Sequence, residues 1–488
     1  MNNHSPPLIP IVCGKSVITD ASDGVGKTYN PATGEVIAEF ARAGQKEVDL
    51  AVSAARKAFD EGPWRRMRPF ERGRVLQRIA QLMLENREEI ARKECADSGK
   101  PLRDAYWEVD CSARFFEFYA GAADKLQGNS IPLGPDWSDW TVKEPIGVSL
   151  HIIPWNYPFQ LIARGVAPAL AAGCSVIVKP SAETPVTAYE FMKICQEAGL
   201  PEGLVNLVNG RGSVAGDLLA RHPCVDQITF TGSVPTGERV MVAAASHAVP
   251  CNMELGGKSP QILFADADLD RALPIVAGGV FTHCGQVCNA GTRLVVERSI
   301  HDTVVERLEQ AIKGMSVGAG IDDPDLGPLV SLGHKKDVEA FYEIARKEGE
   351  LILGAETPKE KPLSEGAFVR PGLVVGASNN TRIAREEIFG PVLTIIPFDG
   401  AEDAARLAND SPFGLVAGVH TSNIDAAMAM AERLRVGQVW INSFAVGLDV
   451  EFPFGGYKMS GFGREKGLEA LAAYQQVKNI CVHHPLPR

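Results

Sequence analysis

The chain has 488 residues, 45% hydrophobic and 22% charged, a composition typical of globular proteins. One hydrophobic core seldom serves so long a chain, so we expect about three domains. The formal net charge is −11 and the basic residues are scattered, which argues against nucleic acid as a partner. No apolar run reaches the roughly 18 uncharged residues of a membrane-spanning helix. The opening MNNHSPPLIP lacks signal-peptide features, so we expect a cytoplasmic protein with no membrane contact.

The sequence predicts a helical region over residues 48–125, followed by alternating strands and helices. Residues 48–125 place apolar side chains three or four positions apart. The segment PDWSDW, residues 135–140, interrupts this pattern. After it, short apolar runs alternate with helical segments such as AYEFMKICQEAG; the runs are GVSLHII, CSVIVKP, GLVNLV, DQITF and PCNMEL.

This alternation predicts βαβ units and therefore an α/β fold with a parallel, doubly wound sheet. The ligand crevice of such a sheet lies beyond the carboxyl ends of its strands. A second series of strands and helices runs from Lys258 to about Lys458, with strand-like runs RLVVE, LTIIPF and QVWIN. The final AAYQQVKNICVHHP predicts an edge strand followed by a tail.

Three features at predicted strand ends suit a nucleotide. The stretch GRGSVAG, residues 210–216, follows a strand, but its third glycine is displaced by one position from the dinucleotide fingerprint GxGxxG. In FTGSVPTG, Gly232 and Ser233 precede a helix whose first amides could hold a phosphate, and a plain glycine turn explains this segment equally well. Lys179 follows the strand CSVIV, where its charge suits ribose or phosphate oxygens; a lysine that extends its amine into solvent is the equal alternative.

Glu254, in NMELGGKSP, ends an apolar strand and precedes two glycines that allow a tight turn. A carboxylate placed in this way can face a cleft and act through water as a general base. A salt bridge to a nearby lysine or arginine is the commoner role of a single glutamate.

Cys288 lies in FTHCGQVCNAGTR, residues 281–293. The ten cysteines of the chain lack the regular spacing of a disulfide scaffold, so most are expected to be reduced core residues. The glycines and the asparagine around Cys288 supply a tight turn that would expose a nucleophilic sulfur near backbone N–H groups. A zinc site would need more ligands than His283 and Cys284 offer within this loop. We rank a nucleophile first, an inert buried thiol second and a metal ligand third.

Seven segments in order resemble the NAD(P)-dependent aldehyde dehydrogenase superfamily, and the resemblance covers nearly the whole chain. The segments are IIPWNYP (152–158), VKPSAETP (178–185), FTGS (230–233), MELGGKSP (253–260), GQVCNAGTR (285–293), EEIFGPV (386–392) and PFGGYKMSGFGRE (453–465). The resemblance implies an aldehyde-dehydrogenase-like fold with a doubly wound Rossmann-type cofactor domain, an α/β catalytic domain and a small β bridging element. The implied boundaries are 1–123 with 146–257 for the dinucleotide-binding domain, 258–457 for the catalytic domain, and 124–145 with 472–488 for the bridging element.

The resemblance also implies roles for single residues. Cys288 would be the nucleophile, Glu254 the base that activates water, and Asn156 the amide that holds the oxyanion together with the Cys288 backbone N–H. No metal is implied. The implied cofactor-binding residues are Ile153, Trp155, Lys179, Ala182, Gly212, Gly216, Gly232, Ser233, Glu387 and Phe389.

The implied reaction oxidises an aldehyde through a thioester on Cys288, with hydride transfer to the nicotinamide and release of the acid by water. Resembling enzymes that pass the acyl group to coenzyme A generally lack a carboxylate at Glu254, so a free acid is expected. Many NAD-preferring members carry a ribose-binding glutamate where this chain has Ala182. We expect NAD as the cofactor. Because Ala182 brings no negative charge that would repel a 2′-phosphate, we also expect NADP to be tolerated.

Signals for the substrate conflict. Family members that oxidise semialdehyde acids resemble this chain in having an arginine at the position of Arg164. An arginine there suits an anionic substrate. Asp449 and Glu451, near the implied substrate entrance, argue against one. We expect an apolar or aromatic aldehyde, with a semialdehyde acid bound by Arg164 as the alternative. The aromatic residues expected near the tunnel are Tyr157, Phe159, Phe281, Phe444 and Phe452.

Two other functions stay open from the residues alone. A cofactor-independent thiol esterase or acyl transferase would use Cys288 and Glu254 but would leave FTGS, Lys179 and EEIFGPV without a role. A non-catalytic binding protein would gain little from a reactive thiol in an open cleft. Because an exposed edge strand needs a cover, we expect the C-terminal strand to pair with a neighbouring subunit in a homodimer or homotetramer.

Overall fold

The computed structural model describes residues 7–354, 356–445 and 450–484, and its largest sheet has eight strands. The strand order is β22-β12-β11-β8-β9-β10-β2-β3. The five strands from β12 to β10 in this order are parallel, while β22 and β2 join antiparallel at the two sides. The bounds are β2 Ile11–Cys13, β3 Ser16–Ile18, β8 Val148–Ile152, β9 Ser175–Lys179, β10 Val205–Leu207, β11 Gln227–Thr231, β12 Cys251–Glu254 and β22 Gly461–Phe462.

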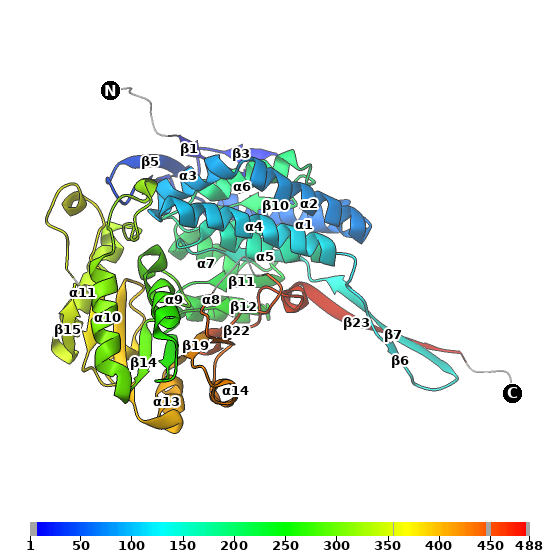
Figure 1. Ribbon diagram of the computed structural model, residues 1–488. Helices are drawn as coiled ribbons and strands as arrows, with labels where there is room; N and C mark the ends of the chain where they lie inside the picture. Colours follow the sequence, from blue (N-terminus) through cyan, green and yellow to red (C-terminus); the bar gives the residue numbers. More distant parts are fainter. Residues whose placement is uncertain (1–6, 355, 446–449, 485–488) are drawn as a thin grey trace.

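A second, seven-stranded sheet follows in the order β15-β16-β17-β14-β13-β19-β20, and only β15 runs antiparallel to its neighbour. Figure 1 shows it below the first sheet, in green to orange. The predicted α/β fold class is confirmed. The bounds are β13 Pro260–Leu263, β14 Arg293–Glu297, β15 Glu350–Leu353, β16 Gly372–Val375, β17 Val392–Phe398, β19 Val416–His420 and β20 Gln438–Ile441.

Helices cover both sheets. The predicted N-terminal helical region contains α1 Gln45–Asp60, α2 Pro69–Glu85, α3 Arg87–Ser98 and α4 Leu102–Ala122. The later helices of the first sheet are α5 Pro158–Ala172, α6 Val186–Glu197, α7 Asp217–Ala220 and α8 Val234–Ala245. Those of the second are α9 Leu269–Phe281, α10 His301–Lys313, α11 Leu332–Glu348, α12 Arg382–Arg385, α13 Gly400–Asn409 and α14 Ile424–Arg433. In the described part of the chain, no helix is long and apolar enough to cross a membrane.

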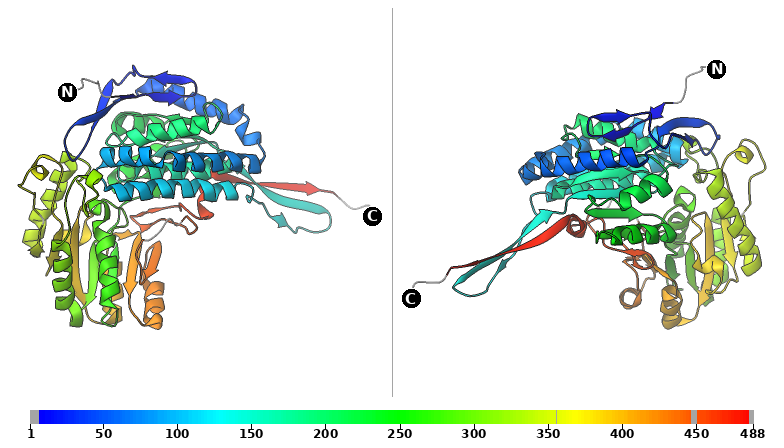
Figure 2. Two further views of the ribbon diagram at one scale, coloured as in Figure 1. Left: turned by 45° about the horizontal axis from the view of Figure 1, so that its top comes forward. Right: turned by 180° about the vertical axis from the view of Figure 1, so that it is seen from behind.

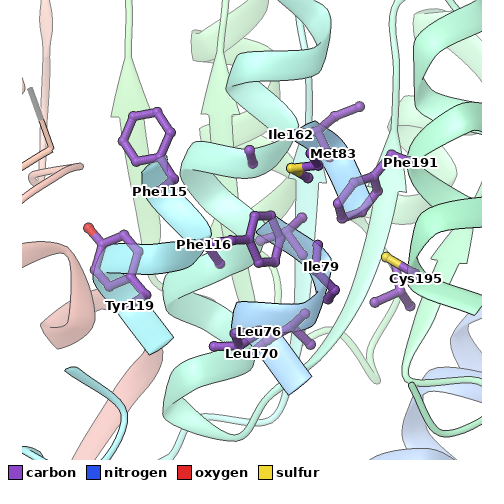
Figure 3. Close-up of a cluster of buried hydrophobic side chains, with 14 of the residues drawn as sticks. Leu76, Ile79, Met83, Phe115, Phe116, Tyr119, Ile162, Leu170, Phe191 and Cys195 are labelled. Carbon is purple, nitrogen blue, oxygen red and sulfur yellow. The ribbon is translucent and has the colours of Figure 1, made fainter. Parts of the chain in front are cut away.

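The largest apolar core lies where α2, α4, α5 and α6 pack together (Figure 3). Phe159 is fully buried in this core and meets Phe191 edge to face, with 6.4 Å between ring centroids. Phe281 is likewise buried, in the core of the second sheet. The expectation that these two rings lie near the substrate tunnel was therefore wrong, because both project from their helices into cores.

A three-stranded sheet forms an arm that projects from the body (Figures 1 and 2). In it β7 Trp137–Pro145 pairs along its full length with β23 Gln475–His483, and β6 Ser130–Ile131 covers the other side of β7. The C-terminal strand is an edge strand, as predicted. Two smaller sheets complete the structure, made by β1 Leu8–Ile9, β4 Val25–Tyr29 and β5 Val36–Ala41, and by β18 Phe413–Gly414 and β21 Tyr457–Lys458.

Candidate active site

A cavity of about 780 Å³ opens between the two large sheets, at the carboxyl ends of β8, β11 and β12. This is the edge at which doubly wound sheets bind ligands. Residues from both sheets line it. The predicted site residues in its wall are Cys288, Glu254, Asn156, Trp155, Gly232, Ser233, Glu387 and Phe389.

The other predicted cofactor residues, Ile153, Ala182, Gly212, Gly216 and Lys179, lie outside this wall. Ile153 donates its N–H to the Lys179 carbonyl at 3.0 Å, and a Cβ added at Gly216 would lie 3.8 Å from Lys179 Cε. Gly212 and Gly216 bound a single π-helical turn before α7. These positions therefore cluster around the end of β9, beside the cavity.

Lys179 is buried, and its ammonium donates to the Pro180 carbonyl at 2.9 Å. Within the described ranges no carboxylate lies within salt-bridge distance of it. Burial lowers the pKa of Lys179 to about 8. A buried ammonium is suited to an anionic ligand, because such a ligand would offset the cost of burying its charge.

Cys288 follows a backbone turn with unusual conformation. His283 and Cys284 have φ values of 49° and 56°, in the left-handed region, and Gly285 follows with φ 73°. A Cβ at Gly285 would lie 2.4 Å from the Gly390 carbonyl oxygen, so only glycine permits this close packing. Cys284 is fully buried in an apolar core, whereas Cys288 is partly exposed to the cavity.

The electrostatic surroundings of Cys288 favour the thiol in the absence of ligands. Burial raises the pKa of Cys288 to about 12, and the carboxylates of Glu254 and Glu387 act in the same direction. The Arg164 guanidinium and the Asn289 backbone N–H oppose them by favouring the thiolate. The sulfur is thus mainly a thiol at neutral pH, and it becomes a nucleophile when its proton is removed.

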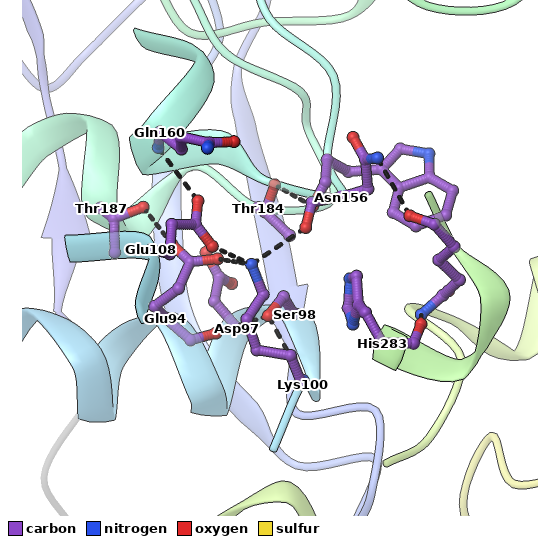
Figure 4. Close-up of polar contacts among 12 residues, drawn as sticks. Glu94, Asp97, Ser98, Lys100, Glu108, Asn156, Gln160, Thr184, Thr187 and His283 are labelled. Atoms are coloured by element: carbon purple, nitrogen blue, oxygen red, sulfur yellow. Dashed lines mark hydrogen bonds and ion pairs between the residues drawn. The ribbon is translucent and has the colours of Figure 1, made fainter. Parts of the chain in front are cut away.

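Asn156 is held from two sides, as Figure 4 shows. Its Nδ2 donates to the Gln286 carbonyl at 3.0 Å, which leaves the second N–H of the amide for a ligand. The backbone carbonyl of Asn156 accepts a hydrogen bond from Lys100 Nζ at 2.9 Å. Lys100 is fully buried and forms ion pairs with Glu94 and Glu108. Sequence reasoning missed this network, since a lysine among helices has the pattern of a surface residue.

Glu254 ends β12 and is 2% exposed. Neither of its carboxylate oxygens has a hydrogen-bond partner among the residues the structure describes. Burial, reinforced by the nearby Glu465 carboxylate, raises the pKa of Glu254 well above its usual range, and the Arg164 charge opposes this shift. Its carboxylate remains available to the cavity.

The two glycines after Glu254 are required by close contacts. A Cβ at Gly256 would lie 2.1 Å from Glu387 Oε2, and one at Gly257 would lie 2.5 Å from the Cys288 carbonyl oxygen. The Gly257 N–H donates to Glu387 Oε1 at 2.9 Å. These glycines therefore bring Glu254, Glu387 and Cys288 to one wall.

Arg164 lines the cavity but forms a buried ion pair with Glu465, and its guanidinium lies 5.0 Å from the centroid of the Phe454 ring. Its charge is thus already balanced within the protein. Glu451 pairs with Arg114 at the surface, and Asp449 lies outside the described residues. The aromatic side chains in the same part of the wall are Trp107, Tyr157, Trp440, Phe444, Phe452 and Phe454.

The fold and this cavity define an α/β enzyme with a thiol and a carboxylate at the carboxyl ends of its parallel strands. The aldehyde dehydrogenase family matches residues 18–480. Aldehyde dehydrogenase 1 of Tanacetum cinerariifolium is 42% identical over 95% of this chain and 93% of that protein. Betaine aldehyde dehydrogenase of Bacillus subtilis (strain 168) is 41% identical over 95% of each.

A solved structure gives the same result. The betaine aldehyde dehydrogenase of Staphylococcus aureus, determined in complex with NAD+, has a TM-score of 0.96 and 36% identity, and the match covers 98% of this chain and 95% of that chain. The chain therefore belongs to the aldehyde dehydrogenase family. It is an oxidoreductase that acts on aldehydes.

Proposed function

We propose that the protein oxidises an apolar or aromatic aldehyde to the carboxylic acid with NAD+, through a thioester on Cys288. The observation that carries this proposal is the common cavity wall of Cys288, Glu254 and Asn156, continuous with an aromatic pocket. A thiol partly exposed to the cavity, a buried carboxylate without hydrogen-bond partners in the described residues and a free amide N–H are the groups that such a reaction needs.

The residues present fit a nicotinamide dinucleotide. Ser233 occupies the N-cap position of α8 without a capping hydrogen bond from its side chain, so the first amides of the helix suit a phosphate. Lys179 is a buried cation with no carboxylate partner among the described residues. Glu387 and Phe389 line the same cavity as Ser233 and Cys288. When bound, the nicotinamide accepts a hydride from the substrate carbon. Lys179, Ser233 and Glu387 would hold its ribose and phosphate oxygens.

The chain's own residues would perform the other steps. Cys288 sulfur, once deprotonated, bonds to the aldehyde carbon, and the resulting oxyanion accepts hydrogen bonds from the Asn156 amide and the Cys288 N–H. After oxidation the acyl group remains on the sulfur as a thioester. Glu254 takes a proton from a water molecule that attacks the thioester carbon, and the carbon–sulfur bond breaks to release the acid and the thiolate.

The balanced Arg164–Glu465 pair weighs against an anionic substrate and leaves the semialdehyde acid as the weaker alternative. One observation favours a second candidate, a cationic aldehyde such as betaine aldehyde. The cavity joins several aromatic rings to the Asp104 carboxylate, a combination that suits a quaternary ammonium group, and two relatives act on betaine aldehyde by name.

The test is reduction of NAD+ and NADP+ by the purified protein with aliphatic, aromatic, quaternary ammonium and ω-carboxylated aldehydes, beside Cys288→Ala. We expect turnover with apolar or aromatic aldehydes and none in the variant. Turnover of ω-carboxylated aldehydes alone would contradict the proposed substrate class. Hydrolysis of an activated ester without nucleotide, and no aldehyde oxidation, would instead support the thiol esterase.

We further propose that NADP+ is accepted, because Ala182 brings no negative charge to repel a 2′-phosphate. It packs instead against a small apolar cluster of Ile9, Ala38 and Phe40. The ratio of kcat/KM for the two cofactors measures this tolerance. Strict use of NAD+ with no turnover of NADP+ would contradict it.

We also propose a homodimer or homotetramer that buries the arm. The support is the free edge of β23, with exposed apolar side chains such as Val477 and Val482. An uncovered edge of nine residues would invite uncontrolled pairing with other chains.

A further inference from the structure

Three rings lie together at one end of the cavity. Trp155 and Phe389 line the wall and meet edge to face, with 5.2 Å between their centroids. His334, on the first turn of α11, packs behind both, with centroids 5.1 Å from Trp155 and 6.2 Å from Phe389. His334 itself is not part of the wall, so it reaches the cavity only through its two neighbours.

His334 also bonds to the backbone of Phe389. Its Nε2 lies 2.8 Å from the Phe389 carbonyl oxygen, and since a carbonyl only accepts, Nε2 carries the proton. Phe389 has φ 56°, in the left-handed region that non-glycine residues rarely adopt. An unfavourable backbone conformation persists only where surrounding contacts fix it.

The same face of α11 also contacts Gly390, the residue that follows Phe389. A Cβ added at Gly390 would lie 2.8 Å from both methyl groups of Val338, so Gly390 packs directly on that side chain. His334 and Val338 are four positions apart and therefore lie on one face of the helix. This face of α11 fixes the backbone on both sides of the Phe389 carbonyl.

We propose that His334 is a positioning residue that holds Phe389 and Trp155 in the orientation that receives the nicotinamide ring. The inference rests on the proposed function, in which Phe389 packs near the nicotinamide. His334 makes no contact with substrate. Its effect is on the shape of the cofactor end of the cavity, through one hydrogen bond and two ring contacts.

The test compares NAD+ affinity, measured by calorimetry, in the wild type, His334→Leu and His334→Gln. The leucine removes the donor, and we expect it to weaken NAD+ binding about tenfold, the effect of one lost hydrogen bond at the upper end of the usual range. A glutamine amide can reach the same carbonyl, so it should restore most of the affinity. KM for the aldehyde, and alkylation of Cys288 in the absence of nucleotide, should stay at wild-type values.

Leu332→Ala is the matched control, because Leu332 lies on the same turn of α11 with 55% of its surface exposed and should bind NAD+ as the wild type does. If His334→Leu does not fold, His334→Asn replaces it, since its shorter amide does not reach the carbonyl. Wild-type affinity in the leucine or asparagine variant would overturn the inference. So would a glutamine variant as weak as the leucine variant. A wild type that binds no NAD+ would overturn the proposed function first, and this inference with it.

Discussion

At the residue scale, burial shifts both reactive groups toward their protonated forms, so each must lose its proton before it can act. The pKa values of Cys288 and Glu254 are both raised, and each carboxylate near the sulfur opposes its ionisation. Arg164 is the cation that opposes these shifts at both groups. The proton of Cys288 must therefore be removed before the sulfur can bond to an aldehyde carbon.

This state predicts a steep pH dependence of Cys288 alkylation by iodoacetamide in the absence of nucleotide. With a pKa of about 12, the thiolate fraction rises about tenfold per pH unit, so the rate should rise in the same way from about pH 7 to pH 10. Mass spectrometry of the peptide that contains Cys288 measures it. Cys284, fully buried on the same peptide, serves as an internal control that stays unlabelled. A rate that levels off below about pH 9 would contradict the raised pKa.

The residues that carry the chemistry could largely be predicted from the sequence, whereas the residues that position them could not. Cys288, Glu254 and Asn156 stand in segments whose order and spacing reveal them, and the structure places all three in one wall. Lys100 and His334 act through partners that are distant in sequence, such as Glu108 bound to Lys100 and the Phe389 carbonyl bound to His334. No local pattern encodes such contacts.

At the scale of elements, the strand and helix alternation was read correctly because buried parallel strands form short, continuous apolar runs. Amphipathic spacing likewise identified the first helices. The destination of an apolar side chain was harder to predict. Phe159 and Phe281 stand beside site residues in sequence, yet the turn of each helix directs them into cores. The two-residue strand β22, which pairs with β12 beside Glu254, has no sequence signal of its own.

The junction of α3, α4 and α5 depends on Lys100. Replacing it with methionine would leave two buried carboxylates unpaired, so Lys100→Met should lower the free energy of unfolding by about 3–5 kcal/mol. The Asn156 carbonyl would also lose its donor, and kcat should fall with little change in NAD+ affinity. Urea denaturation and steady-state kinetics measure the two effects.

Lys93→Met, on the outer side of α3, is the control for this prediction. Its salt bridges with Glu89 and Glu190 are partly exposed, and its loss should cost about 1 kcal/mol or less. Equal destabilisation by the two variants would show that the buried network has no special role.

At the scale of the whole molecule, the arm is the clearest sign of assembly. Tyr474 O accepts from Ile146 N at one end of the β7–β23 ladder, and His484 N donates to Asp136 O at the other. In an antiparallel strand, the backbone N–H and C=O groups of successive residues point to opposite sides. The backbone groups of even-numbered residues of β23 therefore point to β7, and those of odd-numbered residues point outward. The outward N–H and C=O groups are available to pair with a strand of a neighbouring subunit.

Val477→Pro removes one outward N–H and should leave the pairing with β7 intact. We expect the wild type to form a multiple of the 52.4 kDa chain and this variant to form smaller species, measured by light scattering after size exclusion. Lys478→Pro removes an N–H directed at β7 and should disrupt the arm itself. An unchanged mass for Val477→Pro would show that the edge of β23 is not an interface.

The central claim, a thioester on Cys288 that Glu254 helps to hydrolyse, is tested most directly with Glu254→Gln. Incubated with NAD+ and an aldehyde that the wild type oxidises, this variant should produce about one equivalent of NADH per chain and then stop. Intact-protein and peptide mass spectrometry should then show the acyl group on Cys288. Continuous turnover with no adduct, or an adduct at any other residue, would contradict the account.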